Sequence, residues 1–600
     1  MRFGVLALDY DGTIALDGVL HPDVRSAIDE VRGRGIAVVI ATGRTLSDLK
    51  ALVGSFAFLD AIVAENGAVI AFPNDQFRLL AAPPPTAFLQ ELSRRAIPFT
   101  TGQCVVEVEA AWAQQVLAVI RELELPLVLL FNRGRLMVLP QAVSKATGLR
   151  AALSALRLSA HNAIAIGDAE NDHDLLAACE LGVAVSWGSA ALKRCAEEVL
   201  QGEGPGAVAA YIRRAAEQVR LPPDRLGRRH LTLGTLEDGR PLALAIRGRN
   251  LLIAGDPQSG KSWVTGLLCE QLILQGYCVW VIDPEGEFGG LESLPGVVIL
   301  GGGRRPPHLN DLVRALRYPD VSVVVDLAHV AHQEKFEFLY SLLPMLASLR
   351  RSSGLPHRIV LDEAHYFLHE PDVSQLLDLQ LAAYVLVTYR PADLHCDVRR
   401  AIEGTIVTRI TDEYEEQALL SLCGAGRPEW RSVLPNLALG EAALLPGIEE
   451  AGGKLQKFNV LPRLTPHIRH KTKYLDVPLI ERRGFVFTRN GKAVAPPART
   501  LKEFVALLAH LPPQVLDGHA RRGDFSRWAQ EVLHDRLLAS DLQTVERQYQ
   551  LGQISRLSKA LAEPIQERYE PLPPALSVSP PASAEAPVPL ELASPRAVKA

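Results

Sequence analysis

The chain of 600 residues lacks the features that would place it in a membrane or in an oxidising compartment. Its seven cysteines stand singly, without the paired spacing of a zinc site or a disulfide scaffold. No apolar run approaches the length of a membrane span, and no signal peptide precedes the first strand-like run. The formal net charge is only −5, so we expect no global attraction to nucleic acid. These absences predict a cytoplasmic protein without a membrane partner.

The sequence contains enough hydrophobic residues, 48% of the total, to form the cores of several domains. Alternating strand and helix patterns predict an α/β protein: a doubly wound core, a small α+β cap inserted into it, a second α/β domain and a mostly helical module. The tail is rich in Pro, Ala and Ser and is predicted to be disordered. The predicted boundaries are 1–75 and 142–220 for the core, 76–141 for the cap, 225–475 for the second domain, 480–568 for the helical module and 570–600 for the tail.

The first chemical signal is an apolar run of strand character, FGVLAL, that leads to Asp9. Asp11 follows two residues later, and Gly12 permits a tight turn that re-aims its carboxylate. In α/β patterns, acids at the carboxyl end of a strand lie where such sheets bind ligands. Carboxylates favour Mg²⁺. On these residues alone, a solvated Asp-Gly turn explains the pattern equally well.

Later segments favour the functional interpretation. Each places polar residues after an apolar strand or at a predicted helix start: Thr42-Gly43-Arg44, Lys145, and Asp168 with Asn171 and Asp172. A carboxylate can approach a phosphate dianion only where cations screen both groups, and Mg²⁺ together with Lys145 would supply that screening. Structural alternatives stay open, with Lys145 as a surface helix residue and Thr42 as a helix N-cap.

With these motifs in this order, the first third of the chain resembles the haloacid dehalogenase superfamily of phosphohydrolases, and especially its Cof-type subfamily. That subfamily carries a cap between the second and third motifs, and the segment AENGA at 64–68 is typical of it. The resemblance implies a Mg²⁺-dependent phosphatase that acts on a small phosphorylated substrate through an aspartyl-phosphate. The cap contains no motif that names the substrate.

The resemblance also implies a role for each matching residue. Asp9 would be the nucleophile, and Asp11 would protonate the leaving oxygen and then deprotonate the attacking water. Two further groups are implied: the phosphate-binding residues Thr42, Gly43, Lys145 and Asn171, and the metal-binding residues Asp9, Asp11, Asp168 and Asp172.

A second motif, NLLIAGDPQSGKS, begins at Asn250. A strand leads into a full match to the Walker A pattern, and a helix is predicted over 263–275. In such a loop the backbone N–H groups cradle phosphates, Lys261 reaches the β- and γ-phosphates, and Ser262 binds Mg²⁺. The predicted ATP site comprises Gly255, Asp256, Pro257, Gln258, Ser259, Gly260, Lys261 and Ser262.

Further strands with polar ends are predicted at 279–288, 321–327, 358–365 and 384–390. The third ends in Asp362 and Glu363, as a Walker B strand does. Asp362 would support Mg²⁺ through water, and Glu363 would polarise the attacking water. Arg390 ends the fourth strand, where a sensor of the γ-phosphate would lie.

The segments VIDPEGEF, LDEAH and VTYRP resemble the HerA/FtsK-type motor ATPases over about residues 225–475. That resemblance implies ATP hydrolysis by a homo-oligomer, with a ring as one form. Tyr389 stands where HerA proteins often carry Gln. Ring ATPases need an arginine from a neighbouring subunit, and four arginines are candidates, each more often a surface residue: Arg390, Arg399, Arg400 and Arg409.

Three functions remain open at this point. The favoured one is a Mg²⁺-dependent phosphatase fused to an ATP-binding and ATP-hydrolysing domain. The second is a hexameric motor that moves or processes DNA and carries an accessory phosphatase-like domain. The third is a nucleotide-gated scaffold whose C-terminal helices recruit a partner. The basic run Pro466–Lys473 would touch nucleic-acid phosphates in the second case, or would be solvated surface.

Overall fold

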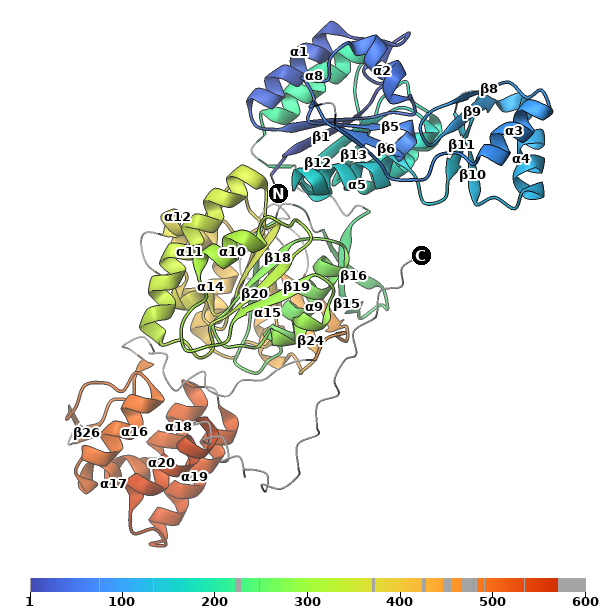
Figure 1. Cartoon of the computed structure of the whole chain (residues 1–600). Coiled ribbons are helices and arrows are strands. Elements are labelled where there is room, and N and C mark those ends of the chain that lie inside the picture. The colour runs from blue at the N-terminus through green and yellow to red at the C-terminus, as the bar shows by residue number, and fades with distance from the viewer. Residues whose placement is uncertain are drawn as a thin grey trace, which may run out of the picture. The chain divides into compact units, whose positions relative to one another are not determined.

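The computed structural model describes residues 2–569 with gaps, and it divides into two compact units, Met1–His470 and Lys471–Ala600 (Figure 1). The gaps are 75, 133, 219, 222–227, 246, 248, 370–372, 423–427, 446–454, 467–478, 480–482, 490 and 534. The predicted basic run from residue 467 onward and the predicted disordered tail lie outside the described residues. Among the described helices, none combines the length and the apolar character that crossing a bilayer requires.

An eight-stranded sheet, in the order β14-β13-β12-β1-β4-β5-β6-β7, organises the first 220 residues. The strands from β14 to β5 are parallel, and β6 and β7 continue the edge in antiparallel register. The strands are β1 (Val5–Asp9), β4 (Ala37–Ala41), β5 (Ala61–Ala64), β6 (Val69–Ala71), β7 (Phe77–Leu79), β12 (Ala163–Gly167), β13 (Leu181–Ala184) and β14 (Glu198–Val199), with a separate hairpin of β2 (Ala15–Leu16) and β3 (Val19–Leu20).

Helices cover both faces of this sheet because alternate strand residues are apolar on both sides. Leu6 and Leu8 share one buried cluster with α1 and α8, whereas Val5 and Ala7 share another with α5. The two groups of helices lie on opposite faces of the sheet in Figure 1. The helices are α1 (Pro22–Gly33), α2 (Leu46–Val53), α5 (Lys145–Leu156), α6 (His173–Ala178), α7 (Ala190–Cys195) and α8 (Gly204–Ala216).

The inserted cap is a four-stranded antiparallel sheet, in the order β10-β11-β9-β8, covered by two helices. Phe88 and Val116 of the helices pack against Val106 and Val108 of the sheet. The elements are α3 (Thr86–Arg94), β8 (Phe99–Thr101), β9 (Val106–Glu109), α4 (Ala113–Glu122), β10 (Leu127–Asn132) and β11 (Arg135–Pro140).

A second, eleven-stranded sheet follows, in the order β16-β15-β25-β24-β23-β17-β22-β21-β18-β20-β19. The six strands from β17 through β19, together with β23, are parallel, and the remaining four are antiparallel. The strands are β15 (His230–Leu236), β16 (Pro241–Ala245), β17 (Leu251–Ala254), β18 (Val279–Asp283), β19 (Val297–Gly301), β20 (Ser322–Asp326), β21 (Arg358–Leu361), β22 (Tyr384–Thr388), β23 (Gly404–Val407), β24 (Glu441–Leu445) and β25 (Gln456–Val460).

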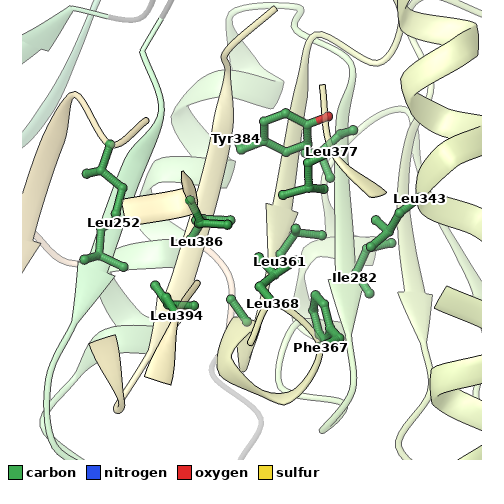
Figure 2. Packing of buried hydrophobic residues seen from close by; sticks show 14 of the residues in the cluster. Leu252, Ile282, Leu343, Leu361, Phe367, Leu368, Leu377, Tyr384, Leu386 and Leu394 are labelled. Atoms are coloured by element: carbon green, nitrogen blue, oxygen red, sulfur yellow. The ribbon is translucent and has the colours of Figure 1, made fainter. Parts of the chain in front are cut away.

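Apolar side chains from neighbouring strands of this sheet form its core. Figure 2 shows Leu252, Ile282, Leu361 and Leu386 from four of these strands, with Leu343 contributed by the long helix α11. The helices are α9 (Lys261–Leu274), α10 (Leu309–Ala315), α11 (His332–Ser353), α12 (Val373–Leu376), α13 (Cys396–Arg400), α14 (Glu413–Leu422) and α15 (Pro428–Val433).

The second unit is helical, as predicted. Its described elements are the hairpin β26 (Thr488–Arg489) and β27 (Lys492–Ala493) and the helices α16 (Leu501–His510), α17 (Pro513–Arg522), α18 (Asp524–Glu531), α19 (Arg536–Gln550) and α20 (Leu557–Tyr569). A cluster of aromatic rings, Phe485, Phe487, Phe504, Phe525 and Trp528, forms its core. Before the hairpin, Phe485 makes an isolated antiparallel bridge to Ala498.

At Gly67 the chain beside the first sheet lies in close contact with the start of α5. The φ of this glycine is +106°, and a Cβ there would lie 1.9 Å from the carbonyl oxygen of Ser144, just before α5. Gly54 also has a positive φ, of +74°, but its Cβ would meet nothing within 4 Å. We expect Gly54→Ala to cost about 1 kcal/mol, or roughly 2–4 °C in Tm, and Gly67→Ala to cost clearly more. Thermal unfolding checks this, and equal losses would contradict the packing described here.

Candidate functional site

Three buried carboxylates meet at the carboxyl ends of two neighbouring strands. Asp9 ends β1, and Asp168 and Asp172 follow β12, which pairs with β1. All three are at most 4% exposed, and one carboxylate oxygen from each lies within 4.8 Å of the others. Thr13 lies between two of them, and its Oγ1 is 3.2 Å from an Asp9 oxygen and 3.4 Å from an Asp168 oxygen. Such a set of hard oxygen donors fits Mg²⁺.

Lys145 is the cation of this cluster. It is the first residue of α5, which Ser144 and Thr147 start with a reciprocal capping box. Its Nζ donates to Asp9 Oδ1 and to Asp172 Oδ1, both at 2.6 Å, and its side chain is 1% exposed. The structural alternative of a surface lysine is therefore wrong.

The charges of the cluster shift its pKa values. Burial, followed by the charge of Asp172, raises the pKa of Asp9 to about 7, although Lys145 opposes the shift. Burial by itself would lower the pKa of Lys145, but Asp172 and Asp9 outweigh it and raise that pKa above its ordinary value. The ammonium group thus stays charged beside an Asp9 carboxyl that titrates near neutrality.

Asp172 and Thr42 are buried, and their side-chain oxygens accept hydrogen bonds from backbone N–H groups. One oxygen of the fully buried Asp172 accepts from the backbone N–H groups of Asp168 and Ala169, both at 3.0 Å. Thr42 is 1% exposed, and its Oγ1 accepts from the N–H of Arg44 at 3.1 Å. Thr42 is not the N-cap of α2, because Thr45 occupies that position.

Asp11 does not continue the alternation of β1, since the strand ends at Asp9 and the chain turns at Gly12, whose φ is +79°. Its two oxygens accept from Nε and Nη2 of Arg44, at 2.7 and 2.6 Å. The Gly12 turn therefore places the second carboxylate against a guanidinium group and outside the cluster of three buried acids.

A cleft of about 270 Å³ opens over Asp9 between the core and the cap. The core lines it with Asp9, Asp11, Gly43, Arg44, Asp48, Asp168, Ala169 and Asn171, and the cap with Glu107, Arg135 and Met137. The predicted residues Asp9, Asp11, Gly43, Asp168 and Asn171 thus share one cleft. The three cap residues were missed, because a strand of an inserted domain gives no local signal of which part of the core it will face.

Glu65 is a fourth residue that the sequence analysis did not single out. It is 1% exposed, and its carboxylate accepts from the N–H groups of Gln103 and Cys104, both at 2.8 Å. The bonds tie the AENGA segment of the core to the cap. An acid directly before Asn-Gly was the available signal, and the backbone there is unusual, with φ of +51° at Glu65 and +53° at Asn66.

The Walker A segment forms the turn between β17 and α9. Gly255 leaves no room for a side chain, because a Cβ would lie 1.9 Å from Thr408 Oγ1. Lys261 is 5% exposed, and its Nζ donates to the carbonyl oxygen of Asp256 in the same turn at 2.9 Å. Ser259 Oγ donates to that carbonyl at 2.6 Å, and Ser262 Oγ donates to Glu287. Of the remaining turn residues, Gln258 has a φ of +64°, Gly260 has a φ of +106°, and Pro257 is buried.

Acids gather at the ends of β18 and β21, beside this turn. Burial and the nearby Asp362 raise the pKa of Asp283 well above its ordinary value. Asp283 accepts three backbone N–H bonds, from Gly286, Glu287 and Phe288, at 2.7 to 3.0 Å. Asp362 and Glu363 are each 2% exposed, and Glu363 lies 3.4 Å from His365.

Arg390 follows β22, the strand between β17 and β21. It is 2% exposed, stacks 4.9 Å from the ring of Tyr389 and lies 3.8 Å from Asp393. Its burial rules it out as a finger for a neighbouring subunit. The same Tyr389 ring lies 5.9 Å from Nζ of Lys261.

Comparisons with known proteins concern the first third of the chain. A family model for haloacid dehalogenase-like hydrolases matches residues 6–92 and 100–212. A phosphoglycolate phosphatase of Methanopyrus kandleri is 31% identical over 225 residues, which are 35% of this chain and 96% of that protein. One from Natronomonas pharaonis is 31% identical over 206 residues, 32% of this chain and 89% of that protein.

Among solved structures, a haloacid dehalogenase-like hydrolase from Bacteroides thetaiotaomicron matches 36% of this chain and 99% of its own, with 17% identity and a TM-score of 0.33. The family model and the near full-length match to the Methanopyrus kandleri protein decide the assignment. Through its first 212 residues, this chain belongs to the haloacid dehalogenase-like hydrolases.

Proposed function

We propose that the N-terminal core and cap form a Mg²⁺-dependent phosphatase that hydrolyses a small phosphomonoester through Asp9. The observation that carries the proposal is the bond of the buried Lys145 to Asp9, which itself lines a cleft formed by residues of the core and the cap. Asp9, Asp168 and Asp172 would hold Mg²⁺, together with the backbone carbonyl of Asp11. When bound, Mg²⁺ would screen the charges of the phosphoryl group and of Asp9.

The reaction would run in two displacements. In the first, Asp9 attacks phosphorus in line, and the P–O bond to the leaving group breaks with its electron pair on the leaving oxygen, which Asp11 protonates. In the second, Asp11 takes a proton from water as that water attacks phosphorus. The P–O bond to Asp9 breaks with its electron pair on the carboxylate, so that inorganic phosphate leaves and Asp9 is regenerated. Lys145 would stabilise the charge that builds on the transferring group, with Thr42, Gly43 and Asn171 as further phosphate ligands.

We further propose a short phosphorylated acid, with phosphoglycolate as the first candidate, as the substrate. The support is that both relatives named above are phosphoglycolate phosphatases and that this chain matches 96% and 89% of their lengths. The cleft of about 270 Å³ suits a molecule of a few heavy atoms beyond the phosphoryl group.

A second candidate function belongs to the eleven-stranded sheet, which we propose binds and hydrolyses ATP. Its support is the turn between the buried strand β17 and α9, in which Nζ of Lys261 donates to the carbonyl oxygen of Asp256. Ser262 and Asp362 would support Mg²⁺ and Glu363 would polarise the attacking water, as in P-loop proteins, and the loop residues from Gly255 to Gly260 would hold the phosphates. DNA translocation by a ring and nucleotide-gated scaffolding remain the alternatives to plain hydrolysis.

Removing the nucleophile tests the first function. We expect Asp9→Asn to lower kcat for phosphomonoesters by about 10³-fold or more, because an amide cannot form the phosphoenzyme. Asp29→Asn, which changes an exposed acid on α1, should leave turnover within about twofold. Colorimetric release of phosphate measures both, and an active Asp9→Asn variant would refute the proposal.

The pKa of Asp9 predicts how Mg²⁺ binding depends on pH. In the metal-free protein this pKa is raised to about 7, so below that pH a proton must leave Asp9 before its carboxylate can bind the cation. Mg²⁺ affinity should therefore rise with pH up to about 7 and level off above it, with up to about a tenfold change per unit. Calorimetric titration with Mg²⁺ at pH 5.5 to 8.5 checks this, and an affinity independent of pH would contradict it.

Lys261→Ala tests the second function. We expect it to weaken ATP binding about 10- to 100-fold, through loss of a charged contact to phosphate, and to leave phosphomonoester hydrolysis unchanged. Lys457→Ala is the control, because Lys457 is paired with Glu441 on the same sheet and lies outside the loop. Fluorescent ATP analogues report binding, and equal binding by the unmodified protein and the two variants would refute the ATP site.

A separate measurement distinguishes the motor alternative, because added DNA that accelerates ATP hydrolysis would favour it.

A further inference from the structure

We propose that Arg135 of the cap, assisted by Arg44 of the core, binds a second anionic group on the leaving part of the substrate. This inference rests on the proposed phosphatase function and assigns the residues that select its substrate. The enzyme would then prefer phosphomonoesters whose alcohol carries a carboxylate over those whose alcohol is neutral.

Arg135 is placed for this role by the cap sheet. It is the first residue of β11 and lines the same cleft as Asp9. Its side chain is 70% exposed, and among the described residues it bonds only to Glu107, through Nη1 at 2.7 Å. Nε and Nη2 thus remain as donors for a ligand, in the forked arrangement that suits a carboxylate.

Arg44 brings a second guanidinium to the same cleft from the core. Its positive charge acts to lower the pKa of Arg135, against the larger raising effect of Glu107, as expected of two cations that face each other across the cleft. An anion between them would relieve that repulsion.

The acids already paired with these arginines do not prevent a substrate anion from taking their place. Glu107 and Asp11 have side chains 31% and 41% exposed. Ion pairs of this exposure contribute little to stability, since water competes for both partners. A substrate anion held in place by its own phosphoryl group at Asp9 has the advantage of proximity. The small volume of the cleft limits the spacer between its two charges to a few atoms.

Recognition by Arg44 would also affect turnover. Arg44 occupies both oxygens of Asp11, the residue proposed to pass the proton to the leaving group. A substrate anion that draws Arg44 toward itself frees an Asp11 oxygen for that transfer. Anionic substrates should therefore have a higher kcat as well as a lower KM.

The test compares two substrates on the full chain with Mg²⁺, namely 2-phosphoglycolate and 2-hydroxyethyl phosphate, which differ by a carboxylate in place of a hydroxymethyl group. We expect the unmodified protein to prefer phosphoglycolate. Arg135→Gln should lower kcat/KM for phosphoglycolate about 10- to 100-fold and change it less than about threefold for the neutral ester.

Arg94→Gln is the matched control. Arg94 lies on the same cap, its side chain is 71% exposed, and it is paired with one acid, Glu91, but it does not line the cleft. It should leave both substrates unaffected. Glu107→Gln should act in the opposite direction, lowering KM for phosphoglycolate, because it frees Arg135 and removes a negative charge.

The outcomes separate the two proposals. If the unmodified protein hydrolyses neither ester, nor any other phosphomonoester, the proposed phosphatase function fails. If it hydrolyses both and Arg135→Gln weakens them equally, or if the preference for the anionic ester survives the change, the phosphatase stands and the assignment of Arg135 is overturned.

Discussion

The N-terminal third depends on one buried ionic contact, that of the Lys145 ammonium with Asp9 and Asp172. Two acids and a lysine taken out of water are costly unless opposite charges meet, and here one ammonium bonds to both carboxylates at 2.6 Å. The fold provides the positions: Asp9 at the end of β1, Asp172 after β12 and Lys145 at the start of a capped helix. Gly67 lets that helix start approach the sheet, and without that approach the ammonium could not reach Asp9.

This arrangement suits the two roles proposed for Asp9, as nucleophile and as metal ligand. The Asp9 carboxyl, with a pKa raised to about 7, lies beside the Lys145 ammonium, and a bound cation would favour its ionised form. Asp11, in contrast, lies outside this buried group and is half exposed at the cleft, where it meets Arg44. Two carboxylates that are two residues apart thus have different surroundings, as different chemical roles require.

Much of this was predictable from the sequence. The parallel strands and their polar ends follow from short apolar runs, because parallel strands end on one edge of the sheet. Thus Asp9 and Asp168 were expected together, and Lys145 was placed correctly at a helix start. Arg135 was not predictable, because its position in the cleft depends on how the cap meets the core. For Glu65 the following Asn-Gly was a local signal, but its bonds to the cap were not predictable. The edge strands β6 and β7 were missed for a related reason, since a three-residue strand carries almost no periodic signal.

The central claim is that Asp9 becomes phosphorylated during turnover. Its most direct measurement is acid quenching of the working enzyme with Mg²⁺ and phosphoglycolate, followed by mass spectrometry of the N-terminal peptides. The account predicts one added phosphoryl group on the peptide that holds Asp9, lost on neutral incubation and absent from Asp9→Asn. Sustained turnover with the phosphoryl group on a different residue would contradict it.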